Sequence, residues 1–303
     1  MSNKVVVVGC GNVGMSYIYA LLNQKTNVNE LILMDVDKEK IEGEVMDLDH
    51  CMSIAPSKIN IRGGNYDDCK DAKIVLISAG ANQKPGETRM DLINKNSKIF
   101  NNIVTNVTKS GFNGIFLVAT NPMDVMTYLT WKYSKFPANK VLGSGPVLDT
   151  SRLKFLIGSK IEVSPKSIHA YVIGEHGDSL FVPWSKASIG LQDIKYFLNE
   201  DEMDNICNKV KNIAYEIINK KGATYYGIGM CLVRITNAIL DDENSIITIS
   251  SYDDKNDVYI SWPSILNKDG VKSRIDINLE DDEKIKLKYS IDVIKQAIED
   301  IEI

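Results

Sequence analysis

The stretch GCGNVG at residues 9–14 is the feature that most constrains the fold of this chain. It directly follows KVVVVG (4–9), a short β-branched run typical of a strand buried on both faces. It directly opens residues 12–24, whose apolar positions predict a helix. A carboxylate, Asp35, ends the next predicted strand about twenty residues after the last glycine. This order of strand, glycine loop, helix and distant acid is typical of a dinucleotide-binding unit.

Each glycine has its own task in such a loop. Gly9 makes the tight turn, Gly11 lets the backbone approach a pyrophosphate, and Gly14 lets helix and strand pack closely. The pyrophosphate would bind at the helix N-terminus, where free N–H groups and the helix dipole favour an anion. Asp35 would accept hydrogen bonds from the adenosine ribose and repel a 2′-phosphate, so NAD is favoured over NADP. The alternative for Asp35 is an acid that caps a helix.

The first half of the chain alternates predicted strands with predicted helices. This alternation, with its short apolar strands, indicates an α/β fold with a parallel, doubly wound sheet of the Rossmann type. We expect strands at residues 4–9, 31–35, 60–64, 73–80 and 114–122, and helices at 12–24, 41–52 and 90–110.

The second half changes character and predicts an α+β domain. We expect a strand and a glycine-rich turn in 166–179, helices at 201–219 and 224–240, and antiparallel strands across 245–277. A final helix begins at Glu280-Asp281-Asp282 and carries apolar residues spaced four and three apart. These are Leu287, Ile291, Ile294, Ile298 and Ile301. We therefore divide the chain into an NAD-binding domain at 1–143 and a substrate and catalytic domain at 144–303.

Composition excludes several classes of function. The net charge is −5 and the pI about 5.4, which disfavours binding to nucleic acid or to an anionic membrane. The sequence contains no apolar run long enough to span a bilayer, and its start lacks the features of a secretory signal. The cysteines are scattered without a CxxC pair, which favours reduced thiols in the cytoplasm over a disulfide frame or a zinc site. They are Cys10, Cys51, Cys69, Cys207 and Cys231.

A candidate acid/base group lies in the second half. His176 stands in GEHGD, between glycines and next to an acid, and histidine is the side chain best suited to proton transfer near neutral pH. Such a histidine needs a carboxylate that fixes its tautomer. The segment VLDTSRLKF offers Asp149 and, three residues on, Arg152, which would share one face of a helix. Arg152 could bind a substrate carboxylate in bidentate fashion. The alternative is an ordinary exposed ion pair.

A polar segment, ANQKPGETR at residues 81–89, holds an amide, two cations and an acid in a short span. Its Pro-Gly pair predicts a surface loop. The functional alternative to a plain loop is a lid that closes over a small anionic substrate.

Taken together, these motifs resemble a known family. The segments GCGNVG, AGANQKPGETR, VATNPMD, VLDTSR, GEHGD and KGATYYG occur in this order. Over almost the whole chain they resemble the lactate/malate dehydrogenase family, and within it the bacterial L-lactate dehydrogenase group.

The resemblance implies a role for each matching catalytic residue. His176 would protonate the reduced carbonyl oxygen and Asp149 would orient it. Arg152 would anchor the substrate carboxylate. Arg89, on the closing loop, would polarise the carbonyl and stabilise negative charge in the transition state. Closure of the loop would exclude water and strengthen each of these charge interactions.

The resemblance also implies binding residues. Asn121 would contact the nicotinamide side and the substrate oxygen, and Thr224 would line the substrate pocket. The residues expected to contact NAD are Gly9, Gly11, Asn12, Val13, Gly14, Asp35, Ala79, Gly80, Ala119 and Asn121.

Substrate choice is expected to depend on Gln83. Malate dehydrogenases place an arginine at the matching position, where it pairs with the second carboxylate of oxaloacetate. A neutral glutamine leaves that carboxylate unpaired in a closing pocket, which is costly, so pyruvate is favoured. Lys84 is adjacent but is expected to point outward. By contrast, VYISWPS at 258–264 is as similar to L-2-hydroxyisocaproate dehydrogenases, which leaves a bulkier 2-oxo acid as the alternative substrate.

Regulation and assembly are also implied by the resemblance. Lys154 and His169 match positions at which bacterial lactate dehydrogenases bind fructose 1,6-bisphosphate between subunits, although the family has arginine at the first. Lysine still binds phosphate, as a point charge without the arginine fork. The alternatives are a solvated helix lysine and a locally satisfied strand histidine. The family implies a homo-oligomer, usually a tetramer. His50 is expected to be structural.

Three rival functions remain at this stage. A malate dehydrogenase is disfavoured by Gln83. A catalytically silent NAD-binding sensor or scaffold has no use for Arg89, Asp149, Arg152 and His176 together. An NAD-dependent glycosidase would need a metal site, and the sequence contains no His/Cys cluster for one.

Overall fold

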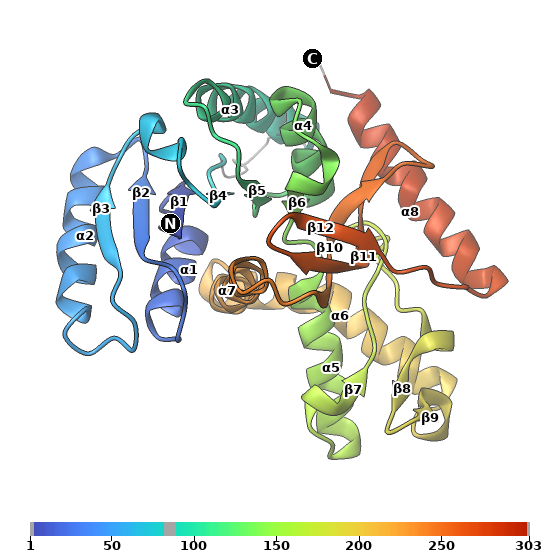
Figure 1. Cartoon of the computed structure of the whole chain (residues 1–303). Coiled ribbons are helices and arrows are strands. Elements are labelled where there is room, and N and C mark those ends of the chain that lie inside the picture. The colour runs from blue at the N-terminus through green and yellow to red at the C-terminus, as the bar shows by residue number, and fades with distance from the viewer. Residues whose placement is uncertain (1–2, 82–88, 302–303) are drawn as a thin grey trace.

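The structure is a computed structural model that describes residues 3–81 and 89–301, with the backbone alone of Arg89. Its helices are α1 (Asn12–Leu22), α2 (Lys38–Cys51), α3 (Arg89–Lys109), α4 (Met123–Ser134), α5 (Val147–Ile161), α6 (Glu200–Lys221), α7 (Tyr226–Leu240) and α8 (Asp281–Glu299). Its strands are β1 (Lys4–Val8), β2 (Glu30–Met34), β3 (Asn60–Gly63), β4 (Ile74–Ile77), β5 (Ile115–Val118), β6 (Val141–Gly143), β7 (Ile168–His169), β8 (Ser188–Ile189), β9 (Gln192–Asp193), β10 (Ser245–Asp253), β11 (Val258–Asn267) and β12 (Gly270–Arg274). Figure 1 shows their arrangement.

The first six strands form a parallel sheet in the order β3-β2-β1-β4-β5-β6. This is the strand order of a Rossmann fold, so the predicted doubly wound α/β class is confirmed. The run of valines in β1 explains why the sheet is covered on both faces. Val5 and Val7 belong to one apolar cluster, and Val6 and Val8 belong to another. Successive side chains of a strand point to opposite faces, so a continuous apolar run requires helices on both sides.

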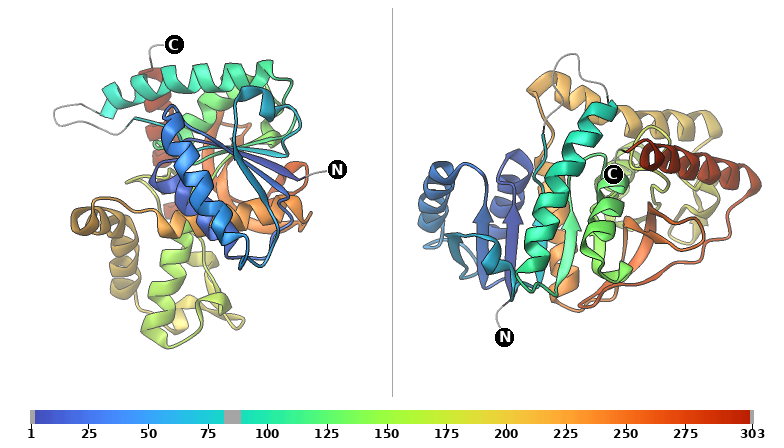
Figure 2. Two further views of the ribbon diagram at one scale, coloured as in Figure 1. Left: turned by 90° about the vertical axis from the view of Figure 1, so that its left-hand side faces the viewer. Right: turned by 90° about the horizontal axis from the view of Figure 1, so that it is seen from above.

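The two apolar clusters correspond to two helical layers. On one face α1, α2 and α7 pack on the sheet through residues such as Ile18, Ile41 and Leu232. On the other face α3 and α4 lie side by side and supply residues such as Phe100 and Met126. Figure 2 shows these layers from two further directions. The helix α7 comes from the second half of the chain, so both halves build the first cluster.

The sheet does not end where the parallel strands end. Within the described residues, β10, β11 and β12 extend it with antiparallel pairs, because Ser250 of β10 pairs with Gly143 of β6. A Cβ at Gly143 would lie 2.4 Å from Thr127 Oγ1 and 2.9 Å from Ser250 Cβ, so this junction needs glycine. The junction joins one half of the chain to the other. The division of the chain at residues 143 and 144 stays a prediction.

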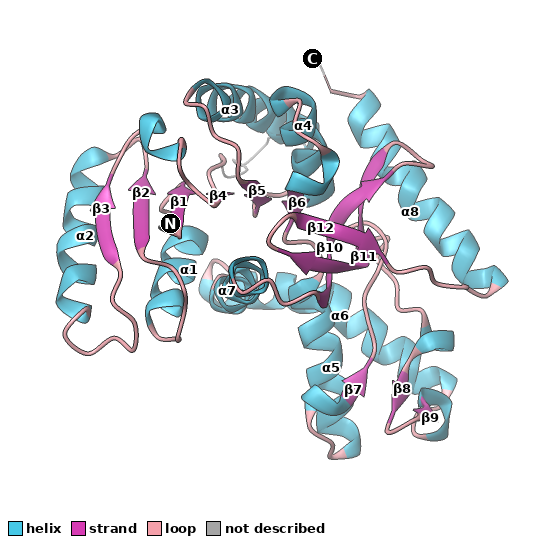
Figure 3. Cartoon of the chain, in the orientation of Figure 1, coloured by secondary structure: helices cyan, strands magenta, loops and turns pink. Residues whose placement is uncertain are grey.

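The remaining second half packs around its own apolar cluster. The long helix α6 begins with a capping box in which Asn199 and Glu202 bond each other's backbone, and it ends at Gly222, whose φ is +85°. Together with α5 it encloses the small antiparallel sheet β7–β8–β9, visible at the bottom of Figure 3. The helix α8 buries Ile291 and Ile294, as its apolar spacing predicts.

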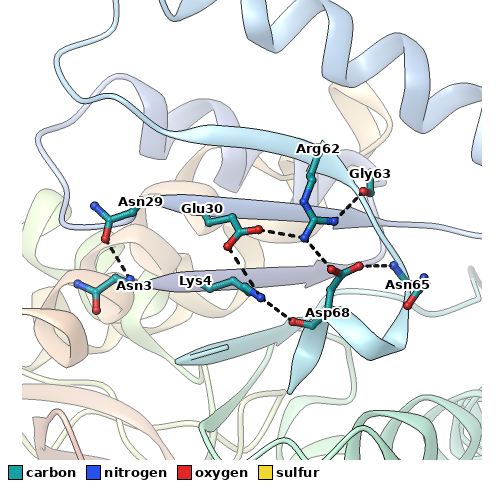
Figure 4. Close-up of polar contacts among 8 residues, drawn as sticks. All are labelled: Asn3, Lys4, Asn29, Glu30, Arg62, Gly63, Asn65 and Asp68. Carbon is teal, nitrogen blue, oxygen red and sulfur yellow. Dashed lines mark hydrogen bonds and ion pairs between the residues drawn. The ribbon is translucent and has the colours of Figure 1, made fainter. Parts of the chain in front are cut away.

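An ion-pair network lies at the opposite edge of the sheet, at β3 (Figure 4). Arg62 Nη2 lies 2.9 Å from Glu30 Oε1 and 2.6 Å from Asp68 Oδ1, and Lys4 Nζ lies 3.8 Å from Glu30 Oε2. The guanidinium side chain of Arg62 is 41% exposed, so each contact is worth only about 1 kcal/mol or less. The network links β1, β2 and β3 to the 3₁₀ turn at Tyr66–Cys69.

The elements expected from the sequence differ from the structure in several places. Helix α4 and strand β6 were not predicted. The strand expected in 166–179 is reduced to Ile168–His169, with single bridges at Ile173 and Gly174. The last antiparallel strand ends at Arg274 rather than near residue 277. Among the described residues, no helix is both long and apolar enough to cross a membrane.

Candidate active site

The turn that carries His176 is built from local constraints. Gly174 has a φ of +96°, and a Cβ there would lie 2.6 Å from Ser290 Oγ, so the chain turns at a residue that must be glycine. Glu175 is buried, and its Oε2 accepts a 2.6 Å hydrogen bond from Ser179 Oγ. The Ser290 hydroxyl in turn donates to the carbonyl of Ser179 at 2.7 Å. The turn is therefore held by a hydrogen bond between Glu175 and Ser179, and Ser290 attaches it to α8.

His176 meets the predicted partners from α5. Its Nδ1 lies 2.9 Å from Asp149 Oδ2, while Arg152 Nη1 donates to Asp149 Oδ1 at 3.0 Å. The Nδ1 and Oδ2 atoms are at ion-pair distance but are not aligned as a hydrogen bond. Asp149 is 3% exposed, and the Arg152 side chain is 11% exposed. The spacing of three residues on α5 thus brings an acid and a guanidinium to one imidazole, and the alternative of an exposed ion pair is wrong.

These contacts shift the proton affinities in opposite directions. Burial by itself raises the pKa of Asp149, but the charges and contacts of His176 and Arg152 outweigh it, so the pKa of this carboxyl is lowered. Burial by itself lowers the pKa of His176, and the negative charge of Asp149 outweighs it, so the pKa of the imidazole is raised. Asp149 is therefore ionised and favours an imidazolium beside it.

A further carboxylate that the sequence did not reveal contacts the same turn. Asp124 lies in the first turn of α4 and is 2% exposed. Its Oδ2 accepts a 2.7 Å hydrogen bond from the backbone N–H of His176, and its Oδ1 accepts a 2.5 Å bond from Ser250 Oγ. The available signal was an acid just after Asn-Pro, at the carboxyl end of a buried strand, where ligands bind in open α/β sheets.

Three of the four groups predicted for catalysis, His176, Asp149 and Arg152, line one cavity of about 250 Å³. Asn121 and Ala119, which follow β5, and Val13, from the glycine loop, line the same cavity. Thr224 lies between α6 and α7 and also lines this cavity, as the resemblance implies. The cavity thus joins the acid/base pair, a guanidinium and the nucleotide loop.

Three partly buried hydrogen bonds hold the Asn121 end of this cavity. Asn96 of α3 is 1% exposed, and its Oδ1 accepts from Ala81 N at 2.8 Å while its Nδ2 donates to the Asn121 carbonyl at 3.5 Å. Thr120 Oγ1 donates to the Ala79 carbonyl at 2.8 Å. The loop ends that follow β4 and β5 are therefore fixed to one another.

Helix α6 supplies one wall of the cavity, which sequence reasoning missed. Lys211, Ala214, Tyr215 and Ile218 line it, at the spacing of one helical face. The Tyr215 hydroxyl donates to Asp178 Oδ1 at 3.3 Å, which links α6 to the histidine turn. The sequence of α6 contains no motif, because residues that form a cavity wall need only side chains of suitable size on one face of the helix.

The glycine loop fits a dinucleotide. Gly9 has a φ of +99°, and a Cβ there would lie 2.4 Å from Ala79 N; at Gly14 a Cβ would lie 2.1 Å from the Gly9 carbonyl. At Gly11 a Cβ would meet nothing within 4 Å, and Gly11 caps α1 without any side-chain hydrogen bond. The N-terminus of α1 therefore has free N–H groups beside open space, which suits a pyrophosphate.

Asp35 lies in a second cavity, of about 750 Å³, with Gly9, Gly11, Ala79 and Gly80. Its Oδ2 accepts a 2.7 Å hydrogen bond from Cys10 N, and its Oδ1 accepts a longer bond of 3.3 Å from Asp37 N. The carboxylate thus retains capacity to accept from a ribose. The helix α2 that follows is capped by Asp37 and not by Asp35, so the capping alternative for Asp35 is wrong. Asn12 lies apart from both cavities, in a groove beside Gly11.

Some predicted residues cannot be placed. Gln83 and Lys84 lie outside the described residues. Arg89 begins α3, and its side chain also lies outside the description. Among the described residues, no cluster of His, Cys, Asp and Glu could hold a metal ion.

The two expected effector residues do not line the same cavity among the described residues. Lys154 lines a third cavity, of about 410 Å³, together with Lys166 and Arg234. Its Nζ lies 5.2 Å from the centre of the Tyr171 ring, and burial lowers its pKa. His169 is exposed on β7 and is not one of the described residues that line this cavity.

The C-terminal sheet does not line the cavity that holds His176. Trp262 is 7% exposed and packs with Ile173, Phe181 and Leu279, and its Nε1 donates to the Ile275 carbonyl at 2.7 Å. No described residue of 245–277 lines the cavity that holds His176. The unusual VYISWPS segment is therefore part of the core.

Comparisons with known proteins agree with this geometry. Residues 3–143 match the family model of the lactate/malate dehydrogenase NAD-binding domain, and residues 147–302 match the model of its α/β C-terminal domain. L-lactate dehydrogenase 1 of Bacillus cereus is 47% identical over 306 residues, which cover 98% of this chain and 97% of the relative.

Solved structures are equally similar. MGS-M5, a lactate dehydrogenase from a Medee basin deep-sea metagenome library, superposes with a TM-score of 0.96 at 47% identity and covers 99% of this chain and 98% of its own. The minor L-lactate dehydrogenase of Enterococcus mundtii in its ligand-bound form gives a TM-score of 0.96 at 43% identity, over 100% of this chain and 99% of its own. Since both halves match in order and the similarity spans nearly the whole chain, the protein belongs to the lactate/malate dehydrogenase family, with NAD as its cofactor.

Proposed function

We propose that this chain is an NAD-dependent L-lactate dehydrogenase, which reversibly transfers a hydride between NADH and pyruvate. The observation that supports it best is the shared cavity, which His176, Asp149 and Arg152 line together with Val13 of the glycine loop and Asn121. A 2-oxo acid needs a cation for its carboxylate and a proton donor for its carbonyl oxygen, and both lie here. A silent NAD-binding sensor would require neither.

The proposed steps use the chain's own groups. The bound nicotinamide supplies or accepts the hydride. Arg152 binds the substrate carboxylate with the part of its guanidinium that does not contact Asp149. His176, whose Nδ1 faces Asp149, donates a proton from Nε2 to the carbonyl oxygen as this oxygen gains negative charge. In lactate oxidation the neutral imidazole takes the proton back at the same nitrogen.

Asp149 keeps the imidazole in the correct orientation and stabilises its charged form in this scheme. Asn121 and Thr224 also line the cavity in which the substrate would bind. Arg89, the first residue of α3, polarises the carbonyl, a role that rests on the resemblance alone. The buried position of Asp149 strengthens its attraction to the imidazolium because few water molecules screen it.

Pyruvate is the proposed substrate because Gln83 offers no charge for a second carboxylate. The packing of Trp262 in the core disfavours a specificity role for the C-terminal sheet. A bulkier 2-oxo acid would instead have to fit against Ala214, Tyr215 and Ile218 of α6.

The pure protein is expected to oxidise NADH with pyruvate at a kcat/KM roughly a hundredfold above oxaloacetate, because oxaloacetate would bury an unpaired carboxylate. Against 2-oxoisocaproate the expected advantage is roughly tenfold, a difference of a few methylene groups in a fixed pocket. Steady-state kinetics with the three acids measures both ratios. Gln83→Arg should raise the oxaloacetate value.

Each contrary outcome has its own meaning. A preference for 2-oxoisocaproate would keep the mechanism and transfer specificity to the wall formed by α6. NADH binding without turnover of any of the three acids would overturn the enzymatic function and favour a sensor or scaffold.

We also propose that fructose 1,6-bisphosphate activates the enzyme at Lys154 and His169, between subunits of a homotetramer. Lys166, which lines the same cavity as Lys154, adds positive charge at that surface, whereas Arg234 is paired with Glu243 at 2.7 Å. The bisphosphate is expected to lower the KM for pyruvate in the wild type and not in Lys154→Gln, with Lys288→Gln on the exposed face of α8 as the matched control. Saturation curves and light-scattering mass, with and without the bisphosphate, measure both. Identical wild-type curves across neutral pH would refute activation.

A further inference from the structure

Asp124 is a buried carboxylate on which three distant segments of the chain meet. It belongs to α4, accepts from the backbone of His176 at 2.7 Å, and accepts from Ser250 of β10 at 2.5 Å. Both oxygens are therefore held by donors. A carboxylate that is 2% exposed is costly to bury, so its retention here requires compensation by such contacts.

The contact acts on the residue that carries the proton. A hydrogen bond to the N–H of His176 fixes the backbone from which the imidazole projects, while Asp149 faces the ring itself at 2.9 Å. The backbone and the ring of this residue are thus held by two different carboxylates. A displacement of about 1 Å in such a group can cost roughly a hundredfold in rate.

We propose that Asp124 is a positioning residue of the reaction, which fixes the backbone of His176 and places a second buried negative charge near its imidazole. The inference rests on the proposed function, because it concerns the same proton donor.

The charged groups around Asp124 set the direction of the effect. Burial raises the pKa of Asp124 to about 6, while the bonds from Ser250 and His176 oppose this rise, so the carboxyl is mainly ionised at neutral pH. Glu175, in the same turn, opposes its ionisation. Toward the imidazole, Asp149 acts most strongly, Asp124 adds negative charge in the same direction, and Arg152 acts against both.

Asp124→Asn removes the negative charge of the side chain while it keeps the size and the hydrogen bonds of that side chain. The amide oxygen can still accept from His176 N–H, and the amide N–H₂ can donate to Ser250 Oγ, so the backbone contact remains while the charge is lost. Pyruvate reduction needs the imidazolium and falls as pH rises through its pKa. Removal of a negative charge lowers that pKa, so the falling limb of kcat/KM against pH moves to lower pH. A merely structural role would lower activity at every pH without moving the limb.

Ser250→Ala provides a second variant in case the first does not fold. Without the serine hydroxyl the Asp124 carboxyl holds its proton more tightly, so less negative charge remains at neutral pH. The limb should then move in the same direction by a smaller amount. Asp254→Asn, which removes an exposed carboxylate from the turn between β10 and β11, is the charge-matched control and should leave the limb in place.

A readout independent of turnover keeps this inference separate from the proposed function. Diethyl pyrocarbonate modifies neutral imidazoles, and the difference between each protein and its His176→Asn form reports His176 alone. The pH at which His176 becomes reactive should fall in Asp124→Asn and stay unchanged in Asp254→Asn. A wild type inactive toward 2-oxo acids would refute the function, yet this titration would still test Asp124. An unmoved titration in folded Asp124→Asn, or in Ser250→Ala if the former does not fold, would overturn the inference.

Discussion

Replacement of His176 with asparagine is expected to lower kcat for pyruvate reduction by about three orders of magnitude, the middle of the range for loss of a general acid. The imidazole lines the substrate cavity and lies 2.9 Å from Asp149, and asparagine cannot donate and regain a proton near neutral pH. Steady-state kinetics measures kcat, and fluorescence titration should show that NADH still binds.

The matched control for this variant is His50→Asn, at an exposed position on α2 that lines none of the cavities. It should keep the wild-type kcat. If His176→Asn retained more than about a tenth of the rate, another group would have to be the proton donor. In the wild type, the raised pKa of His176 means that pyruvate reduction persists to higher pH than an ordinary histidine would allow. Lactate oxidation needs the neutral imidazole, so its rise with pH is displaced to higher pH by the same shift.

Arg152→Lys is expected to lower kcat/KM for pyruvate by about two to three orders of magnitude. The Arg152 side chain is 11% exposed and its guanidinium already bonds Asp149, so it can offer the substrate carboxylate a second, planar pair of donors. An ammonium has no fork, and the loss of one charged hydrogen bond together with displacement from Asp149 costs about 3–4 kcal/mol. The measurement is the ratio of kcat/KM values, with NADH saturating.

Arg62→Lys serves as the arginine-to-lysine control, because it changes the ion-pair network of Figure 4 and lines neither the substrate cavity nor the dinucleotide cavity. It should slightly lower stability and leave kcat/KM within about twofold. A fall of less than tenfold in Arg152→Lys would show that another cation anchors the carboxylate.

The parallel sheet could be predicted because its signals are local. The run of valines in β1 predicts a strand that is buried on both faces. The glycines of the loop and Asp35 stand at the spacing that dinucleotide binding requires. Likewise, Asp149 and Arg152 are close in sequence and share one face of α5.

Helix α4 could not be predicted for a physical reason. It is buried almost throughout, from Met123 to Thr130, so it lacks the polar face that gives a helix its period in sequence. Its β-branched and aromatic residues also favour a strand. Asp124 was missed for a different reason. Its partners Ser250 and His176 are distant in sequence and become its neighbours only after folding.

The wall formed by α6 and the junction of Gly143 with Ser250 were also beyond sequence reasoning. Lys211 and Tyr215 belong to an ordinary amphipathic helix, and they line the cavity only because of how α6 packs in the folded chain. A strand pair between distant segments is specified by tertiary contacts rather than by residue type.

The shared sheet has a consequence for how such a chain can be divided in evolution or in the laboratory. Expression of the dinucleotide-binding half alone would turn β6 into an open edge of buried residues and would strip α7 from the face it covers. Such an edge exposes unpaired backbone N–H and C=O groups that can pair with other chains. The fragment should therefore aggregate instead of binding NAD as an independent domain. Two halves that are distinct in sequence therefore need not fold independently, and we expect these two to fold as one cooperative unit.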